Sequence, residues 1–424
     1  MENRVKPGFR RIALFFNAIA FYTSGQLAWM YYGYFDLMKE YFGVSGTEMG
    51  YLGLVTGLVM IVCWPLGGMI ADKLSIRTAF VSMMGATTAI YVINSFVTNY
   101  YVYLGIVFVS CLVVGGLYGL AAKVVKRIYT PETENTGVGF LWAVYAIIGT
   151  ALGFSGAYLV ELYGLAGWSP LMFLFAGASA VAAIGGFFLL KEENLNPVVV
   201  DESAEKSAFK FADVKKVLLM PELWVAGLIY HTMLMMTCAG ISAISMLGDI
   251  YMVPLAVITA IGTVRAYLAR VFLAPTSGAI VAKTKDSMGM IRYLCIAAIA
   301  GIVLFFLFPM TSDYMYIAII LVVVMTIGFG MQAPLWMTPI NDMRIAPAYQ
   351  GTAVGVYNAI GCISDAYIYI LTGWFVDTYG VYQGNQMTFG FIGVMLAICI
   401  VLTIVCGKMI KKRNAKLDAG ELTI

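Results

Sequence analysis

The chain has 424 residues, of which 61% are hydrophobic and only 12% are charged, and its mean hydropathy is +0.86. These values lie far outside the range of soluble domains, so they exclude a soluble protein and place the chain in a lipid bilayer. The net charge of +3 follows from membrane topology and does not indicate nucleic-acid binding.

Apolar runs recur along the whole chain. A helix that crosses the hydrocarbon needs about 20 mostly apolar residues, because its backbone groups must bond within their own segment. The first run begins after Arg11 and lacks the cleavage site of a signal peptide, so we expect it to remain as a helix. Twelve runs meet the requirement, with approximate bounds 10–35, 47–72, 77–97, 101–128, 135–163, 168–190, 222–249, 253–281, 291–311, 313–338, 350–378 and 385–408.

The basic residues are distributed unevenly between the loops. Nearly all of the 26 Lys and Arg fall in the two tails and in every second loop. Lys39 is the one basic residue that we place in a loop on the opposite side of the membrane from the tails. Because positive residues in short loops stay cytoplasmic, both termini are predicted to be cytoplasmic. The chain is therefore expected to be a multi-pass protein of the cytoplasmic (inner) membrane.

One long polar stretch separates the sixth and seventh runs. It divides the chain into a six-helix bundle (1–190), a cytoplasmic linker (191–221), a second six-helix bundle (222–410) and a cytoplasmic tail (411–424). "GGMIADK" of the first half aligns with "SGAIVAK" of the second, which indicates an internal repeat. We predict an all-α membrane protein with twelve transmembrane helices in two pseudo-symmetric bundles.

The stretch "GGMIADKLSIR" follows the second run, where the apolar sequence stops abruptly. With twelve helices, a basic linker and the repeat, it resembles the major facilitator superfamily over the whole chain. The signature of that family for this loop is glycine, three residues, aspartate, a basic residue, any residue, glycine and two basic positions. Ser75 and Ile76 depart from the signature. The matching positions are Gly68, Asp72, Lys73 and Arg77.

The resemblance implies a secondary transporter that works without a cofactor and is not an enzyme. In the family, the small residue lets helix 2 approach helix 11, and the aspartate faces the positive N-terminal dipole of helix 11. This contact holds the cytoplasmic gate shut in one state. Ala282 stands where the second half would carry the aspartate, so such a latch would be one-sided.

Two longer segments resemble a bacterial group within the superfamily that includes oxalate/formate-type exchangers. They are "YYGYFDLMKEYFGVSGTEMGYLGLV" and "VPLAVITAIGTVRAYLARVFLAPTSGAIVAKTKDS". Drug/proton antiporters usually carry glycine-proline in helix 5, whereas Phe154 follows Gly153 here. This departure disfavours drug export.

Three charged residues lie deep in predicted spans, where a charge costs about 2.5 to 3.5 kcal/mol. Arg265 lies about 18 Å and Arg270 about 25 Å into helix 8, and a separation of five residues puts them roughly 140° apart on a regular helix. Asp365 is predicted at mid-depth in helix 11. If Arg265 pairs with Asp365, Arg270 is the cation that remains for a substrate anion. Otherwise Asp365 could be a proton-coupling carboxylate.

Two further ionisable residues have open interpretations. Lys123 lies near the cytoplasmic end of helix 4, where it either extends to the interface or binds an anion together with the arginines of helix 8. His231, the only histidine, either makes a hydrogen bond between packed helices or relays protons.

Amides and aromatic residues complete the candidate cavity. Gln26 on helix 1 and Gln332 on helix 10 are strong candidates, because an amide in lipid needs a partner. Tyr145 on helix 5 and Trp336 on helix 10 are further substrate-binding candidates, although most aromatic residues serve packing or the interface.

The leading prediction is a transporter that moves a small organic anion of carboxylate or sugar-acid type, as an exchanger or with protons. Its partners would be the substrate, a coupling proton or counter-substrate, and the lipid bilayer, with the protein working as a monomer. A carrier of a neutral sugar or polyol is the alternative, with the arginines in internal ion pairs. A membrane enzyme or receptor without transport is disfavoured, because the sequence has no Walker loop, HExxH motif, catalytic Ser/His/Asp set or added soluble domain.

Overall fold

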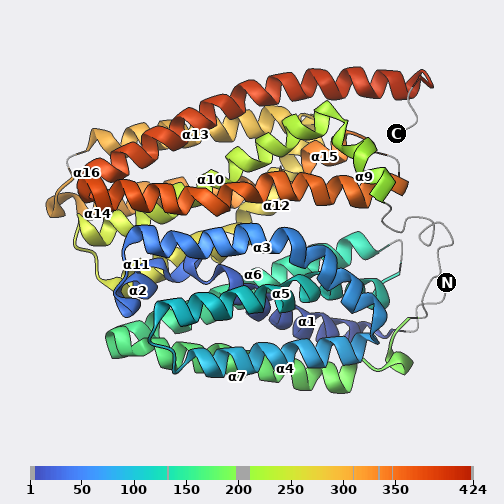
Figure 1. Ribbon diagram of the computed structural model, residues 1–424, viewed down its shortest axis with the longest axis horizontal. Helices are drawn as coiled ribbons and strands as arrows, with labels where there is room; N and C mark the ends of the chain where they lie inside the picture. The colour runs from blue at the N-terminus through green and yellow to red at the C-terminus, as the bar shows by residue number, and fades with distance from the viewer. Residues whose placement is uncertain are drawn as a thin grey trace. The chain divides into compact units, whose positions relative to one another are not determined.

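The computed structural model describes residues 5–130, 133–196, 211–308, 310–332, 335–345 and 347–421 (Figure 1). Every regular element within these residues is a helix. The chain divides into two compact units. Unit 1 comprises Met1–Val199 and Pro254–Val271, and unit 2 comprises Val200–Val253 and Phe272–Ile424. The predicted bundles, 1–190 and 222–410, differ from these units in the placement of 254–271, and their boundaries remain a prediction.

Unit 1 contains the N-terminal helices together with one later segment of the chain. Within it α3 packs along α5, α4 along α7, and α1 against α5, α6 and α7. The later segment comprises α11, the π-helical turn η3 and the start of α12, and it packs on α6. The elements are α1 (Pro7–Trp29), α2 (Tyr31–Phe42), α3 (Gly46–Lys73), α4 (Ile76–Asn94), α5 (Tyr100–Ile128), α6 (Glu134–Tyr163), η1 (Gly164–Gly167), α7 (Trp168–Leu189), η2 (Glu192–Asn194), α11 (Leu255–Thr263), η3 (Val264–Leu268) and α12 (Ala269–Thr284).

Local capping signals fix where α3 and α5 begin. Ser45 and Glu48 form a reciprocal capping box at the start of α3. The Asn99 side chain accepts hydrogen bonds from two backbone amides at the start of α5. Each cap satisfies amide groups that the first turn of a helix leaves without partners.

The predicted first span, 10–35, is interrupted in the structure. α1 ends at Trp29, α2 continues to Phe42, and Tyr34 within α2 has non-helical angles (φ −129°, ψ 28°). The carbonyl of Tyr32 accepts a hydrogen bond from the Arg265 side chain, at an Nη2 to O distance of 2.5 Å. A side chain that enters the backbone hydrogen-bond ladder is a recognised cause of a kink.

Unit 2 consists of long helices and a few short helical elements. α10 packs along α16, and α13 packs against both α14 and α16. α16 holds the last two predicted spans, changes direction at Gly380 (φ +79°), and continues well beyond the predicted end of the last span at 408. The elements are α9 (Phe211–Leu218), α10 (Pro221–Asp249), the rest of α12, α13 (Ser287–Leu307), η4 (Ser312–Tyr314), α14 (Met315–Gln332), α15 (Thr338–Asp342) and α16 (Pro347–Asp418).

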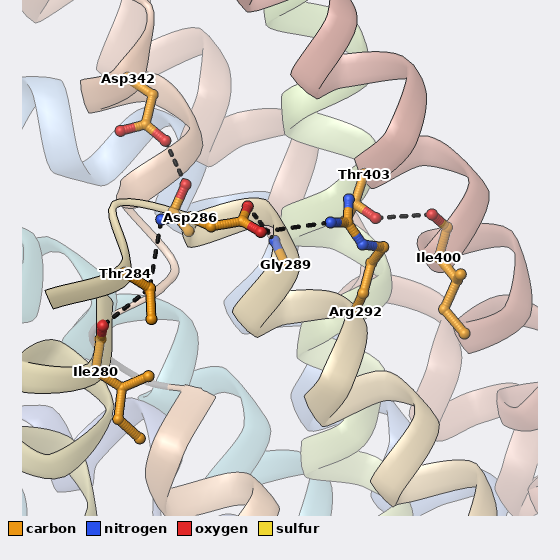
Figure 2. A network of polar contacts seen from close by, with 9 residues as sticks. Ile280, Thr284, Asp286, Gly289, Arg292, Asp342, Ile400 and Thr403 are labelled. Carbon is orange, nitrogen blue, oxygen red and sulfur yellow. Dashed lines mark hydrogen bonds and ion pairs between the residues drawn. The ribbon is translucent and has the colours of Figure 1, made fainter. Parts of the chain in front are cut away.

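A polar network joins the start of α13 to α15 (Figure 2). Asp286 caps α13 by accepting the amide of Gly289 at 2.7 Å, and it pairs with Arg292 at 3.6 Å. The Ser287 hydroxyl donates to the Asp342 carboxylate. Burial raises the pKa of Asp342 above its ordinary value, the Ser287 hydrogen bond lowers it, and the negative charge of Asp286 raises it.

The end of α16 packs back onto the segment after α15. Arg413 donates to the carbonyl of Met343 at 3.1 Å, and Asn414 donates to the carbonyl of Asp342 at 3.0 Å. Arg344 and Asp418 form an ion pair at 2.9 Å. The predicted cytoplasmic tail therefore begins as a continuation of the last helix.

A second polar cluster fixes the start of the predicted linker in unit 1. Arg127 of α5 donates to the carbonyl of Asn196 at 2.6 Å and pairs with Glu192 at 2.5 Å. The backbone amide of Asn196 donates a hydrogen bond to the backbone carbonyl of Arg127 at 2.8 Å. These contacts hold 192–196 against the end of α5.

Nine helical segments of the described chain are long and apolar enough to cross a membrane. Two of them, 137–189 and 353–418, span 53 and 66 residues, which is enough for two crossings each. They are interrupted at η1 and at Gly380 respectively. α1 and α2 provide the first predicted crossing, so the observed helices account for the predicted spans.

Candidate functional site

The two arginines of predicted helix 8 flank a change in helix type. η3 is a π-helical turn, and the amide of Ala269 bonds the carbonyl of Val264, five residues earlier. Such a turn accommodates one extra residue, so residues five apart are related much as residues four apart are in an α-helix, by roughly 40°. The regular-helix estimate that separates Arg265 and Arg270 by about 140° is therefore wrong here.

Arg265 is nearly inaccessible, with 1% of its surface exposed. Its guanidinium donates to the carbonyl of Tyr32 at the interruption of the first span. The same region brings Gly262 close to the backbone of Gly33, where an added Cβ would lie 3.0 Å from the Gly33 oxygen. Arg265 thus supports the backbone of α2 within unit 1.

Arg270 is half-buried at the start of α12. It follows Tyr267 of η3 by three residues in the chain, and Tyr267 packs against Tyr145 of α6. The rings of these two tyrosines lie 6.1 Å apart, centroid to centroid, and both are buried. An arginine next to phenol hydroxyls can bind an anion by charge and by hydrogen bonds together.

Gln26 of α1 also joins this group, with 2% of its surface exposed. Its Nε2 atom donates to the hydroxyl of Tyr267 at 2.5 Å. Its Oε1 atom is buried and has no hydrogen-bond partner among the described residues. The fully buried Tyr22 packs edge-on against Tyr267 at 5.2 Å and Tyr145 at 5.4 Å. We call Tyr22, Gln26, Tyr145, Tyr267 and Arg270 the phenol cluster.

Glycines of α6 allow this close approach. An added Cβ at Gly149 would lie 2.5 Å from the ring of Tyr267 and 2.7 Å from that of Tyr22. One helical turn later, a Cβ at Gly153 would lie 2.5 Å from the Thr263 side chain. Small residues spaced by four are the usual means of bringing two helices together in a membrane.

The remaining predicted residues of unit 1 lie outside this cluster. Lys123 is half-buried on α5. Arg77 donates to the carbonyl of Phe187 of α7 at 2.7 Å, and its guanidinium lies 4.1 Å from the centre of the Phe187 ring. Gly68, Asp72 and Lys73 belong to the last turns of α3, but their environment lies outside the described residues.

His231 ties two helices of unit 2 together. Its Nδ1 atom lies 3.2 Å from the carbonyl of Ile360, and its Nε2 atom lies 2.8 Å from the hydroxyl of Tyr367. Because a carbonyl only accepts, Nδ1 carries the hydrogen, and Nε2 of the neutral ring accepts from Tyr367. This geometry favours the packing interpretation of His231 over the relay.

The other predicted residues of unit 2 lie on α14, on α16 and between them. The ring centroids of Trp336 and Tyr230 lie 6.0 Å apart. The Tyr230 ring stacks on the Tyr357 ring, with their centroids 5.2 Å apart. Gln332 is fully buried, and neither amide atom has a hydrogen-bond partner in the described part of the chain. Asp365 is buried on α16 of unit 2, whereas Arg265 belongs to unit 1, and their pairing remains a prediction.

Tyr267 is the member of the cluster that sequence reasoning missed. It stands in "VRAYLAR", between the two arginines, where an aromatic residue in an apolar run resembles ordinary packing. Its position between Arg265 and Arg270 is the sequence feature that could have indicated Tyr267 as a site residue. Among the described side chains, no group of three or more His, Cys, Asp or Glu could hold a metal ion.

The family profile of the Major Facilitator Superfamily matches residues 12–369. The chain belongs to this superfamily. As a member it is a secondary transporter of a small molecule and not an enzyme, which confirms the predicted class and the all-helical fold of about twelve helices. The more specific resemblance to oxalate/formate exchangers remains a prediction.

Two Escherichia coli (strain K12) proteins are similar to this superfamily member over most of their length. The inner membrane protein YihN is 25% identical over 402 residues, covering 91% of this chain and 92% of its own. The inner membrane protein YqcE is 22% identical over 366 residues, covering 84% and 85%. Both are inner membrane proteins, which agrees with the predicted location.

Solved structures of other transporters have the same fold. The nucleoside transporter NupG aligns with a TM-score of 0.66 at 14% identity, covering 95% of this chain and 99% of its own. A bacterial homologue of the human lysosomal transporter Spinster aligns with a TM-score of 0.69 at 13% identity, covering 96% and 98%. At these identities the likeness establishes the fold and says nothing of the substrate.

Proposed function

We propose that the chain moves a small organic anion, of carboxylate or sugar-acid type, across the cytoplasmic membrane by alternating access. It would act as an exchanger or as a proton symporter. The observation that carries the proposal is the position of Arg270, a half-buried arginine that follows the buried Tyr267 by three residues inside a membrane-spanning bundle. An ionisable residue at such depth is costly and marks a substrate or ion pathway by default.

The two arginines are proposed to have different roles. Arg265 supports the interrupted first helix through the Tyr32 carbonyl, so part of its cost in the membrane is offset by that contact. Arg270 follows Tyr267 by three residues, and the hydroxyls of Tyr145 and Tyr267 can donate to an anion. The proposal therefore assigns anion binding to Arg270 first, with Lys123, Gln332 and Trp336 as further candidate contacts.

A specific observation supports the neutral-sugar alternative. The Arg265 side chain serves an internal hydrogen bond to a carbonyl, where this alternative expects internal ion pairs, and the amide of Gln26 beside Tyr267 would suit a neutral polyol. The two functions differ in what Arg270 does. In an anion carrier Arg270 binds the substrate, whereas in a polyol carrier it only supports the structure.

The experiment is thermal stabilisation of the purified protein by carboxylates, sugar acids, phosphorylated sugars and neutral sugars. A ligand that binds only the folded state raises the melting temperature. We expect anions alone to raise it, and Arg270→Gln to remove the rise while the variant stays folded in detergent. Arg292→Gln is the matched control, because Arg292 lies in the first turns of α13 and pairs with Asp286. Stabilisation by neutral sugars alone, or an unchanged response in Arg270→Gln, would overturn the proposal.

Coupling is proposed to involve Asp365. If Arg265 and Asp365 pair, the double charge swap should restore the activity that each single swap removes. If Asp365 instead carries the coupling proton, Asp365→Asn should abolish proton-driven uptake while exchange persists.

The cytoplasmic gate is proposed to be formed by the residues that match the family's loop signature, which are Gly68, Asp72, Lys73 and Arg77.

A further inference from the structure

The phenol cluster contains a buried acceptor that its own side chains do not satisfy. Gln26 is 2% exposed and uses Nε2 to bond Tyr267. Its Oε1 atom has no hydrogen-bond partner among the described residues. Leaving a buried carbonyl in this condition is costly. A donor from outside the protein is therefore expected at this atom when the site is occupied.

The neighbours of Gln26 restrict what that donor can be. The hydroxyl of Tyr267 accepts from Gln26, and Arg270, with its positive charge, follows Tyr267 by three residues in the chain. A substrate ammonium group would be repelled by that charge. A hydroxyl group is a neutral donor and meets no such penalty. The same ligand would bring its anionic group to Arg270 and a hydroxyl to Gln26.

The surrounding rings are consistent with a hydroxylated carbon skeleton. Tyr22, Tyr145 and Tyr267 form mutual edge contacts, with ring centroids 5.2 to 6.1 Å apart. Their faces and edges offer apolar surface for C–H groups, and their hydroxyls offer further polar contacts. A short dicarboxylate without hydroxyl groups would leave the Gln26 carbonyl unsatisfied.

We infer that the substrate is a hydroxylated organic acid and that Gln26 determines this specificity by accepting a hydrogen bond from a substrate hydroxyl. The inference rests on the proposed function, because it assumes that the anion binds at Arg270. Sites that hydrogen-bond a substrate hydroxyl discriminate strongly against analogues that lack it, because a buried polar group is then left without a partner. One such bond alone should be worth about tenfold in affinity.

The test uses pairs of acids that differ in their hydroxyl groups. Glucuronate is paired with cyclohexanecarboxylate, and glycerate is paired with propionate. Dissociation constants are measured on the full-length protein in detergent. We expect the hydroxylated member of at least one pair to bind at least about tenfold more tightly. Gln26→Met should abolish this ratio by weakening the hydroxylated acid and leaving its partner unchanged.

Two further variants keep the test decisive. Gln383→Met is the matched control, because Gln383 is exposed just after the change of direction of α16 at Gly380, and it should keep the wild-type ratio. If Gln26→Met does not fold, Tyr267→Phe replaces it. This variant retains the ring, removes the hydroxyl that holds the Gln26 amide, and should also reduce the ratio.

The outcomes separate this inference from the proposed function. Equal affinities within each pair, or a ratio that survives Gln26→Met and Tyr267→Phe, would overturn the role of Gln26. If both acids still lose binding in Arg270→Gln, the anion carrier stands. If no acid binds, or if Arg270→Gln binds acids like the wild type, both the inference and the proposed function fail.

Discussion

Replacing Gly149 by alanine tests the packing that builds the phenol cluster. The added methyl group would lie 2.5 Å from the Tyr267 ring and 2.7 Å from the Tyr22 ring, so at least one ring must move. Overpacking of this kind costs about 1 to 3 kcal/mol, and the higher helix propensity of alanine returns at most about 1 kcal/mol. The net loss of stability should therefore reach about 2 kcal/mol.

A functional loss should accompany the loss of stability. If the Tyr267 ring moves, its hydroxyl can no longer hold the Gln26 amide at hydrogen-bonding distance. We expect Gly149→Ala to melt at a lower temperature and to bind a hydroxylated acid at least about tenfold more weakly. The assay is a thermal melt of the purified protein with and without the acid.

Gly139 of the same helix provides the control. An added Cβ there would have nothing within 4 Å, so Gly139→Ala should be as stable as the wild type or slightly more stable. If Gly149→Ala behaves like Gly139→Ala in both stability and binding, the packing of η3 on α6 is wrong. The site built from that packing would then be wrong as well.

Three further variants test the interpretation of individual groups. His231→Phe should lower the melting temperature through the loss of two hydrogen bonds between α10 and α16 and should leave the pH profile of uptake unchanged. Asp342→Asn should raise the melting temperature at pH 7, because the raised pKa of Asp342 means that its ionisation destabilises the folded state. The gain in stability of Asp342→Asn over the wild type is absent below the ordinary pKa of 3.8, grows as pH rises through the raised pKa of Asp342, and is complete above it. Thermal melts of both proteins between pH 4 and pH 8 measure this gain. Arg127→Gln should destabilise unit 1 by about 1 to 3 kcal/mol, because Asn196 and Glu192 lose their shared donor; a thermal melt measures the loss.

Each of these predictions has a result that contradicts it. A flattened pH profile in His231→Phe would favour the proton relay over packing. A lower melting temperature for Asp342→Asn at pH 7 would mean that the carboxylate stabilises the network around Ser287. Wild-type stability of Arg127→Gln would mean that 192–196 is held by other contacts.

The bounds of most spans could be predicted within a few residues. The run 101–128 corresponds to α5 at Tyr100–Ile128, and the run 168–190 corresponds to α7 at Trp168–Leu189. This agreement follows from the physics of the bilayer, because an apolar run of sufficient length has no folded alternative in lipid except a helix. The family follows from the same runs together with the loop motif, and the family profile confirms it.

The details that sequence reasoning missed depend on contacts distant in the chain. The interruption of the first span accompanies the bond from Arg265 to the Tyr32 carbonyl, which joins residues 233 positions apart. The π-helical turn that rotates Arg270 toward the side of Arg265 has no composition signal within "TVRAYLAR". Helix periodicity assumes a regular helix, so it placed the two arginines on different faces.

The candidate site was anticipated in part. Gln26 is predicted because an amide in lipid needs a partner, Tyr145 is predicted as an aromatic residue of the candidate cavity, and both lie in the phenol cluster. Tyr267 escaped notice because an aromatic residue in an apolar run usually serves packing. Its contact with Gln26 connects helices that are far apart in sequence, and periodicity within one helix carries no information about such contacts.

Uptake by proteoliposomes is the most direct test of anion transport through Arg270. Wild-type protein, Arg270→Gln and Arg292→Gln are reconstituted, and the entry of a radiolabelled acid that stabilises the wild type is followed over time. The proposal predicts saturable uptake by the wild type and Arg292→Gln and none by Arg270→Gln. Saturable uptake by Arg270→Gln at the wild-type rate, or uptake of neutral sugars without any uptake of acids, would contradict it.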